Sequence, residues 1–278
     1  MTVNDYFSIT LSLPPLPEQK KIATILTSVD TVIEKTQAQI DKLNDLKTGM
    51  MQELLTKGIG PDGKPHTEFK DSPVGRIPVG WEVGKIGALS KVIDSMHQTP
   101  NFTLTGSPMV RVTEIRKHEI LDITEAALVD SNTFKEFSRN YTPSSNDILI
   151  ARVGAYFGTT TLVSKNTHFC LGQNTAAIIP KDVEPLFLYI YLKSERCIDQ
   201  MENSVAGGAQ PSLSLKSIKD IKIPLPSREE QSKISAAIES INHKLRATIK
   251  KNSSQKKVKK ALMQDLLTGK VRVTPDPE

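Results

Sequence analysis

A segment of this chain occurs twice, with the second copy 212 residues after the first. The copies run from Glu18 to Thr56 and from Glu230 to Thr268, and they align without a gap with 12 of 39 positions identical. Each copy opens with Glu-Gln just after a proline-containing stretch and closes with Met-Gln, an acidic residue and Leu-Leu-Thr. The spacing far exceeds the period of about 20–50 residues seen in solenoids. The repeat therefore predicts two similar elements that bracket one different domain.

Both copies have the periodicity of long helices with a coiled-coil seam. In the first copy, seam positions follow each other in alternating steps of four and three from Ile22 to Leu54, as coiled-coil packing requires. The second copy keeps the apolar ends of the seam but has a polar middle around Asn252 and Gln255. Antiparallel pairing within one chain and pairing between two chains both fit this pattern. The residues predicted to form the helix–helix or partner interface are Ile22, Leu26, Val29, Ile33, Ile40, Leu43, Met50, Leu54, Ile234, Ile238, Ile241, Leu245, Leu262 and Leu266.

The residues between the copies read as a separate domain in which strands dominate. Pro, Gly, Asn and Ser clusters separate short runs rich in β-branched residues, which is typical of strands. The predicted strands are 109–112, 147–153, 159–163, 175–180 and a short terminal strand at 218–223, with one or two helices over 184–201. The predicted fold class is α+β: one mixed, strand-rich globular domain flanked by two long α-helices that form an antiparallel coiled coil.

Composition and charge limit the class of protein. No run of about 18 apolar residues is present to span a membrane, and the N-terminus lacks the basic and apolar regions of a signal peptide. Two cysteines are too few for a disulfide framework, so we expect a reduced, cytoplasmic setting. Residues 216–278 carry 15 basic and 7 acidic side chains of a chain with net charge +5. This cluster fits a solvated helix face, a phosphate-binding surface or an acidic partner.

The sequence contains no recognisable catalytic motif. It has neither a G-x-x-x-x-G-K-[ST] phosphate loop nor a G-x-G-x-x-G loop, and no Asn-Pro-Pro-aromatic or Asp-Pro-Pro-aromatic tetrapeptide. His168 and Cys170 are the only pair with metal-ligand spacing, and we interpret them as a surface histidine beside a buried cysteine. We therefore predict a chain that is not an enzyme and that binds no metal or cofactor.

Several segments together resemble the specificity (S) subunit of type I restriction-modification systems. The helix beginnings at 13–19 and 223–231 match, as do both Met-Gln-Glu/Asp-Leu-Leu-Thr ends, and so do the segments 75–81, 147–151 and 207–211. The resemblance covers nearly the whole chain and indicates a half-size form with one target-recognition domain. On this basis the predicted divisions are a residual tail of a missing recognition domain (1–17), a first conserved helix (18–58), a recognition domain with its linker (59–227), a second conserved helix (228–270) and a C-terminal tail (271–278).

The resemblance implies a non-catalytic subunit that positions others on DNA. The expected partners are double-stranded DNA, methyltransferase (M) subunits, a restriction (R) subunit and a second copy of this chain bound through the helices. S-adenosylmethionine and ATP with Mg²⁺ are expected on the partner subunits. A dimer with two identical recognition domains would read an interrupted palindrome. The alternative is a truncated or regulatory S fragment that binds methyltransferase subunits without directing modification.

Base reading requires hydrogen-bonding side chains that reach the major groove. Arginine suits guanine there, and asparagine or glutamine suits adenine. The candidates predicted to lie on loops of the central domain are His97, Gln98, Arg116, Lys117, Arg139, Arg152, Tyr156, Gln173, Asn174 and Gln210.

Overall fold

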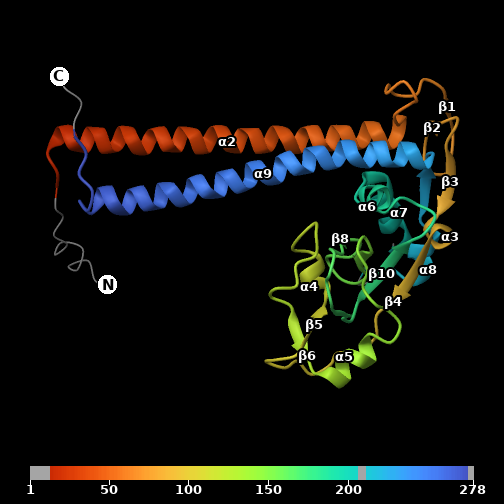
Figure 1. The fold of residues 1–278 in the computed structure, drawn as a ribbon. Coiled ribbons are helices and arrows are strands. Elements are labelled where there is room, and N and C mark those ends of the chain that lie inside the picture. The colour runs from red at the N-terminus through yellow and green to blue at the C-terminus, as the bar shows by residue number, and fades with distance from the viewer. Residues whose placement is uncertain (1–12, 206–210, 275–278) are drawn as a thin grey trace. The chain divides into compact units, whose positions relative to one another are not determined.

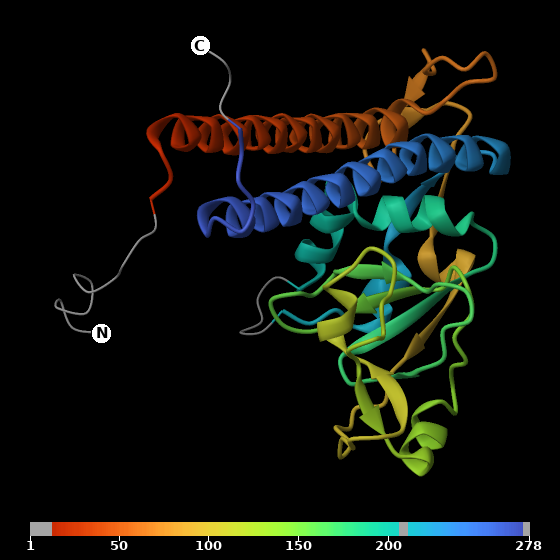
Figure 2. The same ribbon diagram turned by 60° about the vertical axis from the view of Figure 1, so that its left-hand side comes forward.

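The computed structural model describes residues 13–205 and 211–274 of the chain. These residues form two compact units, drawn in Figures 1 and 2. The described part of the first unit comprises residues 13–49 and 239–274, and that of the second comprises residues 50–205 and 211–238. The first unit is helical, and the second contains the central domain together with one end of each long helix.

The two repeat copies are long helices, as predicted. Helix α2 spans Leu16–Lys57 and helix α9 spans Arg228–Leu267. Within the first unit they lie side by side and run in opposite directions (Figures 1 and 2), which confirms the predicted antiparallel pair. Helix α2 begins two residues earlier than predicted and includes Pro17, because a proline in the first turn costs no intrahelical hydrogen bond. Helix α9 ends slightly earlier than predicted, and Gly269 follows it with a φ of 73°, the left-handed conformation that terminates many helices.

The predicted seams face inward. Every interface residue named from the sequence is buried or half-buried. The polar middle of α9 meets polar side chains on α2: Asn252 Nδ2 donates to Gln37 Oε1 at 2.9 Å, and Lys259 Nζ lies 2.5 Å from Asp30 Oδ1. Polar residues in a seam cost stability but select register and partner. The unlike copies are therefore matched to each other in this chain.

The central domain is a strand-rich α+β fold, which confirms the predicted class. A four-stranded antiparallel sheet has the order β4-β10-β7-β8, a three-stranded sheet has the order β6-β5-β9, and two-stranded sheets pair β1 with β2 and β3 with β11. The strands are β1 (Phe69–Lys70), β2 (Ile77–Pro78), β3 (Glu82–Lys85), β4 (Ser90–Asp94), β5 (Ser107–Val110), β6 (Ala127–Val129), β7 (Ile148–Ala151), β8 (Thr160–Leu162), β9 (Cys170–Leu171), β10 (Thr175–Pro180) and β11 (Lys222–Leu225). The shorter helices are α3 (Ile86–Leu89), α4 (Val112–Ile115), α5 (Ser131–Phe137), α6 (Pro185–Leu192), α7 (Glu195–Val205) and α8 (Leu215–Asp220).

One prediction about the end of the domain was wrong. Residues 218–223 were expected to form a single strand, but the segment is divided between α8 and β11. The side chain of Ser214 caps α8 by accepting a hydrogen bond from the backbone N–H of Ser217 at 2.9 Å, and Ile218 is fully buried. A capped turn with one buried apolar residue replaces the first half of the expected strand.

The four-stranded sheet is covered on both faces. Along β7, Ile148 and Ile150 belong to a core that includes α6, whereas Leu149 and Ala151 belong to a core on the other face. Alternate residues of a strand point to opposite faces, so all four side chains are buried. Because the sheet packs against a core on each face, the ends of its strands are held in place, and the polar loops of the domain begin at these ends.

In the second unit, Glu230 joins the ends of the two long helices to the domain. Its Oε1 accepts hydrogen bonds from the backbone N–H of Ile59 at 2.8 Å and from His66 Nε2 at 2.9 Å. Its Oε2 accepts one from Trp81 Nε1 at 3.0 Å. Gly58 lies against this network with a φ of 66°, and a Cβ there would overlap Glu230 and Trp81. The first acidic residue of the second repeat thus anchors the chain where the domain begins.

Candidate nucleic-acid interface

Two loops of the central domain bring predicted base-reading residues together. The loop after β4 carries Gln98, and the loop between β9 and β10 carries Gln173 and Asn174; the three line a cleft of about 220 Å³, which we call the amide cleft. The loops are joined directly, because Thr99 Oγ1 donates to Gln173 Oε1 at 2.7 Å. Thr99 and Gln173 are 74 positions apart in the sequence, and the fold brings their loops to one surface.

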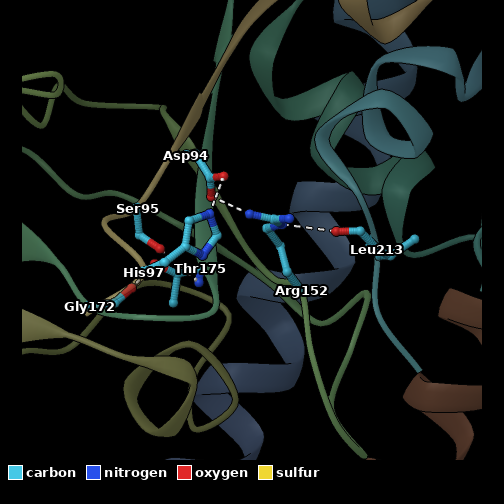
Figure 3. A network of polar contacts seen from close by, with 7 residues as sticks. All are labelled: Asp94, Ser95, His97, Arg152, Gly172, Thr175 and Leu213. Carbon is cyan, nitrogen blue, oxygen red and sulfur yellow. Dashed lines mark hydrogen bonds and ion pairs between the residues drawn. The ribbon is translucent and has the colours of Figure 1, made fainter. Parts of the chain in front are cut away.

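A half-buried ion pair links the segments from which these loops begin. Asp94, the last residue of β4, pairs through Oδ1 with Arg152 Nη1 and lies 3.1 Å through Oδ2 from His97 Nε2. Arg152 Nε donates to the backbone carbonyl of Leu213 at 2.9 Å, as Figure 3 shows. The carboxylate therefore links the ends of β4 and β7 and orients His97 at the start of the loop that carries Gln98.

The second loop has its own support. Thr175 Oγ1 donates to the backbone carbonyl of Gly172 at 2.7 Å, and the Thr175 N–H lies 3.4 Å from Ser95 Oγ (Figure 3). Asn174 adopts a φ of 66°, a left-handed conformation that asparagine tolerates better than most residues. Its backbone carbonyl accepts from the Arg152 N–H at 2.8 Å. The turn of Gln173 and Asn174 is thus held by backbone bonds that leave its amide side chains on the cleft.

A second cleft, of about 490 Å³, carries cationic residues and is called the basic cleft here. Arg116 and Lys117 line it, together with Lys193 from the end of α6. The Arg116 guanidinium lies 4.5 Å from the centre of the Tyr156 ring, a cation–π distance that joins two predicted residues. Lys117 pairs with Glu125 at 2.9 Å and Lys193 with Glu119 at 2.8 Å, and these pairs reduce the positive charge of the cleft.

Not every predicted residue lines one of the two clefts. The Arg152 side chain is only 10% exposed and is engaged by Asp94 and Leu213, so it supports the loops instead of reaching outward as expected. Arg139 is exposed after α5 and lines neither cleft. Gln210 lies outside the described residues. The predicted tail at 1–17 is described only from residue 13 onwards.

Sequence reasoning missed Arg111, which also lines the amide cleft. It was treated as part of the β-like run 109–112, but the strand ends at Val110 and Arg111 is the N-cap residue of α4. The signal available in the sequence was Glu114, three residues later, because an acidic residue at this spacing often reaches back to the start of a helix. His118 and Lys193 of the basic cleft were missed as well.

Several titratable side chains outside the two clefts are buried or packed within the domain. Burial raises the pKa of the Asp147 carboxyl, although it accepts hydrogen bonds from Tyr141 Oη at 2.8 Å and the Ser144 N–H at 2.9 Å. Burial also raises the pKa of the Cys170 thiol, to about 11. His168 lies against the ring of Phe134, with centroids 4.7 Å apart. Among the described residues, no group of three or more His, Cys, Asp or Glu side chains is arranged to hold a metal ion, and no helix is long and apolar enough to cross a membrane.

Comparison with protein families gives one match that covers most of the chain. Residues 7–45 and 78–256 match the family described as type I restriction modification DNA specificity domain.

Curated relatives extend the match over nearly the whole chain. The MjaVIII type I restriction enzyme specificity subunit of Methanocaldococcus jannaschii is 31% identical over 278 residues, covering 96% of this chain and 63% of the relative. The putative MjaX specificity subunit of the same organism is 32% identical over 272 residues, covering 95% of this chain and 60% of the relative. The chain therefore spans about three fifths of the length of these relatives.

Solved structures show a similar fold. The HsdS subunit from Thermoanaerobacter tengcongensis superimposes with a TM-score of 0.57 at 22% identity, covering 97% of this chain and 63% of that one. The type I restriction-modification S subunit from M. genitalium gives a TM-score of 0.56 at 16% identity, covering 95% of this chain and 62% of that one.

Proposed function

The chain belongs to the type I restriction-modification DNA specificity family, and from this membership we propose that its central domain reads one half of a bipartite DNA sequence. The observation that carries the proposal is the amide cleft, where Gln98, Gln173 and Asn174 meet although they come from separate loops. Amide side chains can pair with the major-groove edge of adenine through two hydrogen bonds. A supported cluster of such groups is the chemistry that base reading requires.

We assign phosphate contact to the basic cleft. Arg116, Lys117 and Lys193 gather there, and contacts with phosphates fix the position of a protein on duplex DNA without selecting a sequence. Residues 82–215 contain 12 basic and 14 acidic side chains, so positive charge is local on this domain. Partner subunits would therefore supply a large share of the phosphate contacts, and their attraction to DNA would weaken with salt.

In this proposal the chain directs other subunits and performs no chemistry. Methyltransferase subunits would carry S-adenosylmethionine, and a restriction subunit would carry ATP and Mg²⁺. Support comes from the family description, which names DNA specificity, and from relatives that are named specificity subunits of type I restriction enzymes.

The repeated motif supports a second recognition domain at the other end of the helix pair. Leu55, near the end of α2, is 2% exposed in the core of the second unit, whereas its counterpart Leu267 in α9 is 58% exposed. Gly58 is enclosed by Glu230 and Trp81, whereas no atom of the described residues lies within 4 Å of a Cβ placed at Gly269. The second leucine of the identical Leu-Leu-Thr ends is therefore covered by a domain in one case and exposed in the other.

We propose that a second copy of the chain supplies this second recognition domain. Two copies associated through their helices would place identical recognition domains at opposite ends, and a twofold dimer reads an inverted repeat. The site would then be an interrupted palindrome, whose spacer is set by the length of the helices.

One observation favours the alternative of a regulatory fragment. Glu18, the counterpart of Glu230, already accepts hydrogen bonds from Arg272 Nε at 2.7 Å, from Arg272 Nη2 at 2.6 Å and from the Val273 N–H at 3.3 Å. The segment after α9 thus satisfies this carboxylate within one chain. A monomer closed in this way would occupy methyltransferase subunits without directing them to a site.

Sedimentation of the full chain, alone and with its methyltransferase subunit, separates these possibilities. We expect a dimer, and Leu267→Asp should shift it towards monomer because the charge would have to be buried in the contact. Gln264→Glu, at an exposed position one turn earlier, is the matched control and should leave the dimer intact. A monomer under both conditions would exclude the palindrome proposal.

Sequencing of modified bases in cells that carry the gene tests the function itself. A discrete methylated interrupted palindrome is the expected result. An asymmetric motif would retain DNA specificity and exclude the dimer of identical domains, and the absence of any motif would favour the regulatory fragment.

A further inference from the structure

Arg111 enters the amide cleft at the junction of a strand and a helix. It follows β5 and is the N-cap residue of α4, with extended backbone angles φ −114° and ψ 179°. Gln98, Gln173 and Asn174 line the same cleft. The cleft therefore combines one guanidinium with three amides, and the side chain of Arg111 is 35% exposed.

A buried carboxylate holds the guanidinium in one orientation. Arg111 Nε and Nη2 lie 3.3 and 3.2 Å from Glu114 Oε2 and Oε1, and Glu114 is only 2% exposed. Glu114 Oε2 also accepts from the backbone N–H of Arg111 at 2.9 Å. The Arg111 guanidinium carbon lies 5.2 Å from the centre of the Phe102 ring, within the range of a cation–π contact. One edge of the guanidinium is thus fixed before any ligand binds.

Gly172 leaves room for the side chain of Arg111. A Cβ at Gly172 would lie 2.7 Å from Arg111 Cγ, closer than real Cβ contacts allow, and 3.0 Å from the carbonyl oxygen of Val110. Gly172 therefore lets the 172–174 loop pass directly against the stem of Arg111, and any larger residue would displace one of them.

We propose that Arg111 reads a guanine of the half-site. Pairing with Glu114 uses Nε and one hydrogen of Nη2, and among the described residues no acceptor is found for Nη1. The edge formed by Nη1 and Nη2 is the one that donates to guanine O6 and N7 in the major groove. Because the orientation is fixed in advance, little side-chain entropy is lost on binding. This inference rests on the proposed function, and it assigns guanine as the base that Arg111 contacts.

Base substitution in the DNA provides the first test, and it needs no protein variant. The full chain, assembled with its methyltransferase subunit, is titrated with duplexes that carry its methylated motif. In each duplex one guanine is replaced by 7-deazaguanine, which lacks the N7 acceptor. We expect one position in each half-site to lose affinity by at least about 5-fold, the lower end of the range for a bidentate pair, because O6 remains when N7 is removed.

The Arg111→Gln variant completes a double-substitution cycle. It should lose affinity for the unmodified duplex by a similar factor, and it should show no further loss with 7-deazaguanine at the position identified above. Arg76→Gln is the matched control. Arg76 also lies over a phenyl ring, 5.4 Å from the centre of Phe69, but it does not line the amide cleft. The complex that carries Arg76→Gln should bind DNA as tightly as wild type.

Three outcomes would overturn the inference. Arg111→Gln could leave affinity unchanged, it could weaken every sequence equally, or it could remain sensitive to 7-deazaguanine at every guanine. If unmodified wild-type complex shows no preference for any sequence, the proposed function itself fails. If Arg111→Gln keeps the full preference for the guanine identified with 7-deazaguanine, only the assignment of Arg111 fails.

Discussion

Glu230→Gln is a sharp test of how the central domain is attached to the helices. The carboxylate accepts three hydrogen bonds, from the Ile59 N–H, from His66 Nε2 and from Trp81 Nε1. Glutamine has one side-chain oxygen, so its NH₂ group must face at least one of these donors. A hydrogen bond to a charged group contributes about 1.5–3 kcal/mol, and the bonds that remain become weaker when the acceptor is neutral. We expect the free energy of unfolding to fall by about 2–4 kcal/mol.

Trp81 supplies the probe for this measurement, because it is the only tryptophan in the chain and its indole N–H is one of the three donors. Urea unfolding followed by tryptophan fluorescence reports on the unit that contains the network. With a slope of about 2–3 kcal/mol per M for a domain of this size, the midpoint should fall by about 1 M.

The adjacent residue gives a matched control. Glu229 has a 79% exposed side chain and pairs with Lys233 one turn later at 2.7 Å, and exposed pairs of this kind contribute little. Glu229→Gln should change the free energy of unfolding by less than about 0.5 kcal/mol. If Glu230→Gln and Glu229→Gln have equal midpoints, the three hydrogen bonds do not anchor the domain.

Other substitutions follow from the same contacts. Leu55→Ala should cost about 2–5 kcal/mol in urea unfolding, whereas the equivalent Leu267→Ala should cost less than about 1 kcal/mol because that side chain is 58% exposed; equal costs would contradict the unequal coverage of the two ends. Burial raises the pKa of Asp147, so its contribution to stability is present at acid pH and is lost as pH rises through the folded-state pKa. Compared with wild type, Asp147→Asn should therefore be more stable at neutral pH than at pH 4. A difference in unfolding free energy that does not change with pH would refute this. Burial raises the pKa of Cys170 to about 11 and that of Cys197 to about 12, so an aromatic disulfide reagent at pH 8 should label them only after unfolding, and labelling of the native chain would refute this.

The helical part of the fold was predictable because its signal is local and periodic. The seam from Ile22 to Leu54 specifies a helix face through spacing alone, and every interface residue that it predicts is buried or half-buried. The error at 218–223 arose where the signal was weakest. A single capping residue, Ser214, decided between helix and strand there, and such boundaries are the least reliable part of a sequence-based prediction.

The candidate site was only partly predictable, because it depends on which loops meet. Gln98 and Gln173 were named from the sequence as separate candidates, but nothing local indicates that Thr99 bonds to Gln173. Burial is likewise a property of the folded domain: Arg152 follows a strand like many ligand-binding arginines, yet it is enclosed. A glycine such as Gly172 gives no hint in sequence that it makes room for Arg111.

In the proposed function, Arg152 holds the loops and Arg111 reads the base. Arg152 and Arg111 are each paired with a carboxylate, Asp94 and Glu114 respectively. Arg152 is 10% exposed and also donates to the backbone carbonyl of Leu213, so its donors are directed into the protein. Arg111 is 35% exposed and has a free edge on the cleft. Loss of Arg152 removes the ion pair and the backbone hydrogen bond that hold the ends of β4 and β7, whereas loss of Arg111 removes a donor pair from the surface where Gln98, Gln173 and Asn174 meet.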